Sequence, residues 1–193
     1  MIQSPTYPAR PLNGGALECA RPKRGDWRAE LKWNGWRALV HRPSGAMFNR
    51  QLERLSIELE FHHALAALRS LSTLPDWIDC EALSRRHGIG KGTLILLDII
   101  DGERWPYVAR RRVMQSAAIE LKPGQRPASD ALYIGPSYSD AELLWNEARD
   151  ANSAFGCDFY EGIVCKRADA PYPVQRINAS RETADWIKHR WKH

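Results

Sequence analysis

The fold is decided by residues 26–37, which read DWRAELKWNGWR. We predict one strand at 27–32 and another at 36–41, with Asn34-Gly35 between them. Asn-Gly is a strong signal for a two-residue hairpin turn. The stretch therefore places Lys32 at the end of a strand, just before a tight turn. On its own such a lysine is most often a solvated hairpin residue, so its function depends on what the rest of the chain supplies.

The remaining segments predict further strands and three helices. Apolar residues recur at helical spacing over 56–71, and Ser56 is the predicted N-cap of that helix. Residues 107–121 predict a basic helix, and a third helix is expected from a Ser139 cap to about 152. Because strands outnumber helices and the helices fall between strand groups, the pattern predicts an α+β fold. The other predicted strands are 46–50, 76–83, 93–100, 132–138, 161–167 and 184–190, and residues 1–25 are expected to form an extended lead-in.

Composition narrows the class of protein. The 193 residues are 44% hydrophobic and 26% charged, as in ordinary globular proteins, and carry a net charge of +5. No apolar run reaches membrane-spanning length and residues 1–11 lack a signal-peptide core, so we expect a cytoplasmic protein without membrane contact. The basic balance suits a polyanionic partner. Four cysteines lie far apart without a CxxC pair, which argues against a zinc site built on them and against a disulfide framework.

Charged residues interrupt several of the predicted apolar strands. Glu81 lies within 79–83, Glu161 and Lys166 bracket another strand, and Lys188 and Arg190 share one face of the last. Charges on buried strands are costly unless they are paired or bind a ligand. A fold that gathers Lys32 and these charges around one cleft would hold a metal-bound nucleotide.

In order and spacing these segments resemble the motifs of covalent nucleotidyltransferases, and among them the ATP-dependent DNA ligases of bacterial repair. Residues 32–37 resemble the Lys-x-Asp-Gly-x-Arg motif of that family. The likeness runs from about residue 22 to 190. The other matching segments are 48–50 (Ser-Arg-Asn motif), 78–81 (Asp-Gly-Glu), 96–100 (Phe-Asp-Leu strand), 102–112, 161–166 and 186–190 (the last two motifs).

The resemblance implies a fold and a chemistry. The expected fold is the ATP-grasp-like ligase adenylation fold over 26–193, with antiparallel sheets flanked by helices around a nucleotide cleft. Lys32, as a neutral amine, would attack the α-phosphate of ATP and form lysyl-AMP. Lys166 and Lys188 would clamp the phosphate, and Glu161, with Glu81, would hold Mg²⁺ through hard oxygen ligands.

The resemblance also implies the contacts of the bound nucleotide. Glu30 is expected near the adenine amine, Glu81 at the ribose hydroxyl, and Leu97 against the adenine ring. Arg37 and Arg50 resemble the residues that contact the ribose or the phosphates of the sealed strand. The expected partner is nicked duplex DNA, to which AMP would pass at a 5′-phosphate before a 3′-hydroxyl displaces it, and the protein is expected to be a monomer.

Three departures from the family pattern keep alternatives open. Asn34 replaces the Asp of the first motif, which keeps the turn but loses a charge. Leu97 stands where many relatives have an aromatic residue, so Trp33 or Trp36 would have to supply an aromatic face. The sequence also ends directly after the last motif, without the OB-fold that closes over ATP in the family. We therefore expect weak adenylation from ATP, stronger sealing of a pre-adenylated nick, or a separate OB-fold or DNA-binding partner.

Two other functions fit the same scaffold. One is an RNA ligase or a capping-type nucleotidyltransferase, since some RNA ligase relatives vary at the position of Asn34. The other is an inactive nucleic-acid-binding module, which Asn34 and the absence of the OB-fold favour. The retained charged residues oppose it, namely Lys32, Glu81, Glu161, Lys166 and Lys188.

Overall fold

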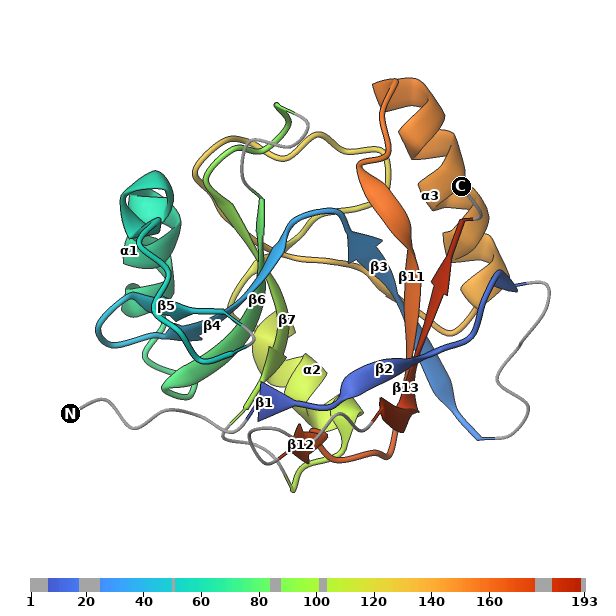
Figure 1. Ribbon diagram of the computed structural model, residues 1–193, viewed down its shortest axis with the longest axis horizontal. Helices are drawn as coiled ribbons and strands as arrows, with labels where there is room; N and C mark the ends of the chain where they lie inside the picture. Colours follow the sequence, from blue (N-terminus) through green and yellow to red (C-terminus); the bar gives the residue numbers. More distant parts are fainter. Residues whose placement is uncertain are drawn as a thin grey trace.

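A computed structural model describes residues 7–17, 25–49, 51–83, 88–100, 104–175 and 182–191. Within these ranges the chain forms two large β-sheets, a two-stranded ribbon of β1 (Tyr7–Pro8) and β12 (Val174–Gln175), and three α-helices. Figure 1 shows α1 outside one large sheet and α3 outside the other. The expected α+β class is confirmed.

The first sheet carries Lys32. Its neighbouring strands are antiparallel, apart from β2, which runs parallel to β13 and brings the N-terminal segment onto the sheet edge. The order across this sheet is β10 (Ser137–Tyr138), β3 (Trp27–Trp33), β11 (Tyr160–Arg167), β13 (Glu182–Arg190) and β2 (Arg10–Asn13).

The second sheet carries Glu81 and Leu97. Its strands are antiparallel except that β9 is parallel to both of its neighbours. The strand β7 is buried along nearly its whole length, as its apolar sequence predicts. The order is β5 (Ala46–Phe48), β4 (Trp36–His41), β6 (Trp77–Leu83), β7 (Thr93–Ile99), β9 (Leu132–Ile134) and β8 (Ile119–Glu120).

The hairpin predicted at Asn34-Gly35 is wrong. The strands β3 and β4 lie where the sequence predicts them, but they belong to different sheets. Gly35 does not adopt the left-handed conformation that a two-residue hairpin turn of this kind requires. Instead the backbone N–H of Asn34 donates to the Phe159 carbonyl at 3.1 Å. The turn is thus anchored to the segment before β11, and the chain crosses there from one sheet to the other.

The first two helices are shorter than the sequence predicts, the third runs three residues past its predicted end, and two predicted caps are wrong. A 3₁₀ turn, η2 (Glu58–Phe61), precedes α1 (His62–Ser70), and the N–H groups of His63 and Ala64 are capped by the distant Asp130 instead of by Ser56. Asp140, not Ser139, caps α3 (Ala141–Phe155), since its carboxylate accepts from two N–H groups of the first turn. The helix α2 covers Tyr107–Gln115, and residues predicted as its last turn form β8. The predicted strand at 132–138 divides into β9 and β10, one in each large sheet.

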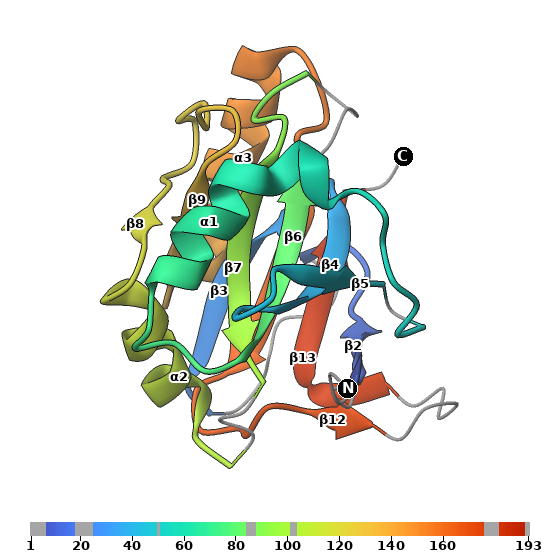
Figure 2. The ribbon, with the colours of Figure 1, turned by 90° about the vertical axis from the view of Figure 1, so that its left-hand side faces the viewer.

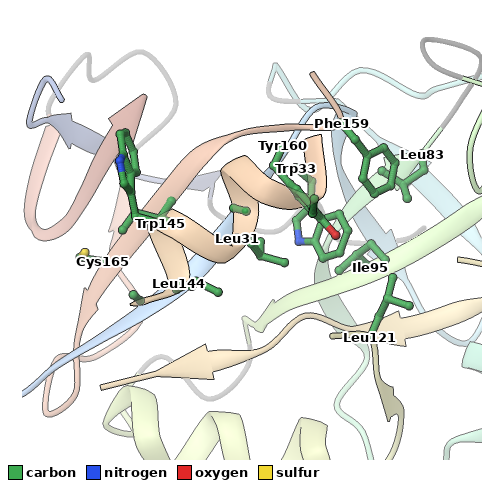
Figure 3. Packing of buried hydrophobic residues seen from close by; sticks show 14 of the residues in the cluster. Leu31, Trp33, Leu83, Ile95, Leu121, Leu144, Trp145, Phe159, Tyr160 and Cys165 are labelled. Atoms are coloured by element: carbon green, nitrogen blue, oxygen red, sulfur yellow. The ribbon is translucent and has the colours of Figure 1, made fainter. Parts of the chain in front are cut away.

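Three buried apolar clusters hold the layers together. Figure 3 shows part of the first cluster, which contains Leu144 and Trp145 of α3 together with Leu31 of the first sheet. Figure 2 shows α1 lying across the outer face of the second sheet, where Leu65 and Leu68 join its apolar residues. A small third cluster, which includes Trp186, lies where the two sheets approach each other. The faces of the two sheets that point towards each other line a cleft. No helix among the described residues is long and apolar enough to cross a membrane.

Candidate active site

A cleft of about 550 Å³ lies between the two sheets and is lined by both. It gathers every site residue that the sequence predicts and the structure describes. Arg50 lies outside the described residues. The predicted residues in the lining are Glu30, Lys32, Arg37, Glu81, Leu97, Glu161, Lys166 and Lys188.

Lys32 lies next to a glycine of the neighbouring strand β11. In the register of the first sheet, Gly162 of β11 pairs with Lys32 on one side and with Arg190 on the other. Gly162 has a φ of 142°, and a Cβ there would lie 1.9 Å from the carbonyl oxygen of His189. Only glycine fits this position, because other residues rarely adopt that conformation and the partner backbone occupies the space. Lys32 and Arg190 therefore lie in register on the two strands that flank Gly162.

Glu161 is the anion between these two cations. The Lys32 ammonium donates to Oε2 of Glu161, and Nη2 of Arg190 lies 3.2 Å from the same oxygen. Both Lys32 and Glu161 remain accessible, with 19% and 22% of their side chains exposed. The pair is therefore held in place yet open to a ligand in the cleft.

Lys188 adds positive charge to the cleft, two residues before Arg190 on the same strand. It pairs with Val164, which in turn pairs with Glu30, so Lys188 and Arg190 share the face that lines the cleft. Partial burial lowers the pKa of Lys188, and the nearby charges of Arg190 and Lys32 lower it further. This repulsion would be relieved by an anion bound among the three cations.

Glu81 and Arg37 face the cleft from directly opposite positions on β6 and β4. Glu81 accepts from the backbone N–H of Gly35 at 3.0 Å. Burial raises the pKa of Glu81 to about 7, although Lys32 and Arg37 oppose that rise. Arg37 is held by Asp79, with Nε at 2.9 Å from Oδ1, and its guanidinium lies 5.5 Å from the ring centroid of Trp186. Arg37 thus connects the two sheets across the cleft.

Glu30 and Lys166 form a buried pair at a second position in the cleft. Their charged atoms are 2.8 Å apart, and Lys166 also donates to the Leu97 carbonyl at 2.7 Å. The hydroxyl of Tyr107 donates to the other oxygen of Glu30, and Arg111 lies 3.5 Å from it. This network places Lys166 beside Glu30 and Leu97, the two residues that the resemblance assigns to adenine.

Asp98 and Arg110 form an ion pair that sequence reasoning missed. Both side chains are fully buried and are joined by two hydrogen bonds of 2.7 and 3.2 Å. Burial alone would raise the pKa of Asp98, but attraction to Lys166 and Arg110 outweighs it and lowers the pKa. A signal was present, since an Asp in a strand as apolar as β7 requires a partner and the following helix is rich in arginine.

Asn34 has a structural contact that the family's Asp could not make. Its side-chain amide donates to the backbone carbonyl of Asp158 at 2.9 Å. An ionised carboxylate only accepts hydrogen bonds, so an Asp in this position would face that carbonyl without a proton to donate. Asparagine at this position therefore helps to hold the turn at which the chain passes from one sheet to the other.

The aromatic residues near the cleft differ in their availability to a ligand. Trp33 is 3% exposed and packs edge-on against Phe159 and Tyr160, at centroid distances of 5.8 and 5.0 Å. Trp36 also lines the cleft and is 53% exposed. Of the two tryptophans, Trp36 is by far the more exposed.

The charges of the cleft match a polyphosphate accompanied by a divalent cation. Six basic side chains and three acidic ones lie in the described lining, an excess of positive charge that suits phosphate groups. Glu161 and Glu81 supply the carboxylate oxygens that Mg²⁺ prefers. The basic lining residues are Arg10, Lys32, Arg37, Lys166, Lys188 and Arg190, and the acidic ones are Glu30, Glu81 and Glu161.

The arrangement of two sheets around this cleft matches the fold of solved DNA ligase structures. More narrowly, the fold is that of the nucleotidyltransferase domains of ATP-dependent DNA ligases. The ligase domain of M. tuberculosis LigD superposes with a TM-score of 0.67 at 17% identity, over 96% of this chain and 59% of that one. A mycobacterial DNA ligase D complexed with ATP gives a TM-score of 0.62 at 19% identity, over 96% and 60%.

A Chlorella virus DNA ligase-adenylate gives a TM-score of 0.52 at 14% identity, over 94% of this chain and 69% of that one. The chain spans about three fifths of the length of the two mycobacterial structures. No family model and no curated protein sequence matches this chain.

Proposed function

We propose that residues 26–193 form the catalytic domain of an ATP-dependent polynucleotide ligase, which carries AMP on Lys32 and seals nicks in DNA. The observation that carries this proposal is the position of Lys32 in the cleft, against Glu161 and beside Lys188 and Arg190. A nucleophile surrounded by preorganised cations suits attack at phosphorus, where negative charge develops in the transition state. The fold shared with ATP-dependent DNA ligases supports the same assignment.

In the first step the Lys32 amine forms a bond to the α-phosphorus of ATP, and the bond from that phosphorus to the pyrophosphate oxygen breaks. The amine must lose a proton to attack. The carboxylate of Glu161 already accepts a hydrogen bond from this amine, so it is placed to take the proton. Lys188 and Arg190 neutralise the charge of the phosphate oxygens. Mg²⁺, for which Glu161 and Glu81 are the fitting ligands, would supply further charge neutralisation.

In the later steps AMP passes from Lys32 to a 5′-phosphate at a nick. The 3′-hydroxyl then attacks that phosphate, AMP leaves, and a phosphodiester bond closes the backbone. The first two steps break and form bonds at the phosphorus of AMP, and the last does so at the phosphorus of the 5′-phosphate. The same cations would neutralise the oxygens of both phosphates in the cleft.

We place the adenine at the Glu30 end of the cleft. Lys166 is buried between Glu30 and the Leu97 carbonyl there, which favours a role at the base over a role at the phosphate. Phosphate binding by Lys166 would require it to leave Glu30. Trp36, with its exposed ring, is the candidate for stacking in place of the family's aromatic residue.

The test is sealing of a duplex that carries a single nick with a 5′-phosphate, in the presence of ATP and Mg²⁺. We expect sealing by the native protein and by Lys122→Ala, an exposed surface lysine, and loss of ATP-dependent sealing in Lys32→Ala. A pre-adenylated nick, a nicked RNA duplex and GTP in place of ATP form the parallel arms.

The arms separate the alternatives. Sealing restricted to RNA would assign an RNA ligase, and a covalent adduct from GTP alone would assign a capping-type enzyme. Binding of nicked duplex without sealing in any arm would contradict the proposal and leave a nucleic-acid-binding module.

A further inference from the structure

We propose that His62, His63 and Asp130 form a binding site for a divalent transition metal of the Zn²⁺ class, separate from the nucleotide cleft. The site lies at the N-terminus of α1, on the outer side of the second sheet. Each side chain offers one ligand atom, and the three ligand atoms all lie within 4.8 Å of one another. None of the three residues lines the cleft.

The distances fit a shared metal ion better than hydrogen bonds. Nδ1 of His62 and Nε2 of His63 lie 3.4 and 3.7 Å from the same oxygen, Oδ2 of Asp130. A charge-assisted hydrogen bond between imidazole and carboxylate would be about 2.7–2.9 Å long. Two ligand atoms that each lie about 2.1 Å from a tetrahedral zinc ion are about 3.4 Å apart. The two spacings therefore leave room for an ion near Oδ2, and the imidazole rings, whose centroids are 3.7 Å apart, would move apart to bind it.

The backbone orients the carboxylate of Asp130. Its Oδ1 accepts from the N–H groups of His63 and Ala64, at 3.2 and 3.4 Å, which leaves Oδ2 directed at the two imidazoles. Metal-ligating carboxylates commonly have such a second hydrogen-bonded oxygen. The N–H of Asp130 donates to the Lys91 carbonyl at 2.8 Å, so the residue is held from both its backbone and its side chain.

Asp130 also has an uncommon backbone conformation. Its φ is 56°, in the left-handed region that non-glycine residues seldom occupy, although Asp and Asn tolerate it best. Strained residues of this kind cluster at ligand sites. The conformation brings the carboxylate onto the first turn of α1 from a segment far away in sequence.

The donor set identifies the class of metal. Two imidazole nitrogens and one carboxylate oxygen suit Zn²⁺ and its neighbours in the transition series rather than Mg²⁺ or Ca²⁺, which prefer oxygen ligands alone. The side chains of His62 and His63 are 58% and 70% exposed, so an ion and a water in the fourth position can reach the site. The positive end of the α1 dipole opposes a cation there, which makes the negative charge of Asp130 essential.

Metal binding would tie α1 to the segment that precedes β9. An ion that binds only the folded protein stabilises it by mass action, so Zn²⁺ is expected to raise the melting temperature. This consequence does not depend on ATP or on Lys32.

The test is calorimetric titration of Zn²⁺ into the whole protein, prepared without a histidine tag and freed of metal with a chelator. We expect one Zn²⁺ per chain with an affinity of about micromolar or tighter, and a higher melting temperature with the metal. Asp130→Asn keeps an oxygen that can cap α1 and tolerates the left-handed conformation, but it removes the charge. Asp130→Asn and His63→Ala are each expected to weaken binding by at least about tenfold.

His41→Gln is the matched control, because His41 hydrogen-bonds Ser44 away from the cluster. It should bind Zn²⁺ as the native protein does. Absence of stoichiometric binding at neutral pH would overturn the proposal, and so would native affinity in both Asp130→Asn and His63→Ala. Neither result bears on nick sealing, which is measured with other substrates and other variants.

Discussion

Replacement of Asp98 by asparagine should remove about 3 kcal/mol of unfolding free energy. Asp98 and Arg110 are both fully buried, and Lys166 lies 3.5 Å from the same carboxylate. Asparagine has nearly the same size but no charge, so it leaves two cations in the interior with one anion fewer. Loss of one partner from a buried ion pair typically costs about 3–5 kcal/mol. The lower end applies here, because Arg110 also donates to the carbonyls of Trp105 and Ala170.

Urea and thermal denaturation measure this loss. For a domain of this size a loss of about 3 kcal/mol corresponds to a fall of about 6–12 °C in melting temperature. Asp76→Asn is the matched control, since Asp76 pairs with Arg42 at 3.1 Å but is 58% exposed. Such an exposed pair contributes less than about 1 kcal/mol. An Asp98→Asn protein as stable as Asp76→Asn would refute the buried-pair reasoning.

The same pair predicts a pH dependence. The attraction of Lys166 and Arg110 overcomes the effect of burial and lowers the pKa of Asp98 in the folded state. The folded protein therefore binds this proton less tightly than the unfolded chain, whose Asp pKa is about 3.9. The stabilisation is present above about pH 4 and is lost as the pH falls below it. Acid unfolding curves should show this loss in the native protein and a smaller one in Asp98→Asn.

Further predictions concern residues of the cleft and its turn. Burial raises the pKa of Glu81 to about 7, so native stability should fall as pH rises from about 4 to 7, and Glu81→Gln should remove that part of the fall in pH-dependent melting. Asn34→Asp loses the bond to the Asp158 carbonyl and should cost about 0.5–1.5 kcal/mol in urea denaturation. Gly162→Ala should cost more than about 3 kcal/mol, measured in the same way, because strain and a backbone clash add. Trp36→Ala should weaken ATP binding by calorimetry about threefold to tenfold without a matching loss of stability.

The positions of the strands could be predicted from sequence because the residue types in a strand reflect which of its side chains are buried. The apolar run of β7 and the boundaries of β4 follow directly from residue type and turn signals. The pairing of strands could not be predicted in this way. Asn34-Gly35 has the residues of a hairpin, but Asn34 hydrogen-bonds Asp158 and Phe159, which are more than a hundred residues away. With these contacts, β4 belongs to the other sheet.

The helix caps likewise include one that local sequence nearly predicts and one that depends on a residue distant in sequence. Ser139 lies one residue before Asp140, whose carboxylate forms the actual cap, so the sequence placed the start of α3 almost correctly. The cap of α1 comes from Asp130, a residue that no local pattern connects with that helix. Local signals predict where a helix begins only when the capping residue is itself local.

The candidate site divides in a similar way. The order of its motifs predicts that Lys32, Glu81, Glu161 and Lys188 line one cleft, and they do. Their chemical roles remain predictions. The supporting contacts of Asp98 with Arg110 were not predicted, because a buried carboxylate signals the need for a partner but does not identify it.

The intact mass of the protein after incubation with ATP and Mg²⁺ bears most directly on Lys32. We predict a gain of one AMP, mapped to Lys32 by peptide analysis, that is absent in Lys32→Ala and retained in Lys122→Ala. An adduct on another residue would contradict covalent catalysis by Lys32. So would the lack of any adduct when pyrophosphatase is added to draw the reaction forward.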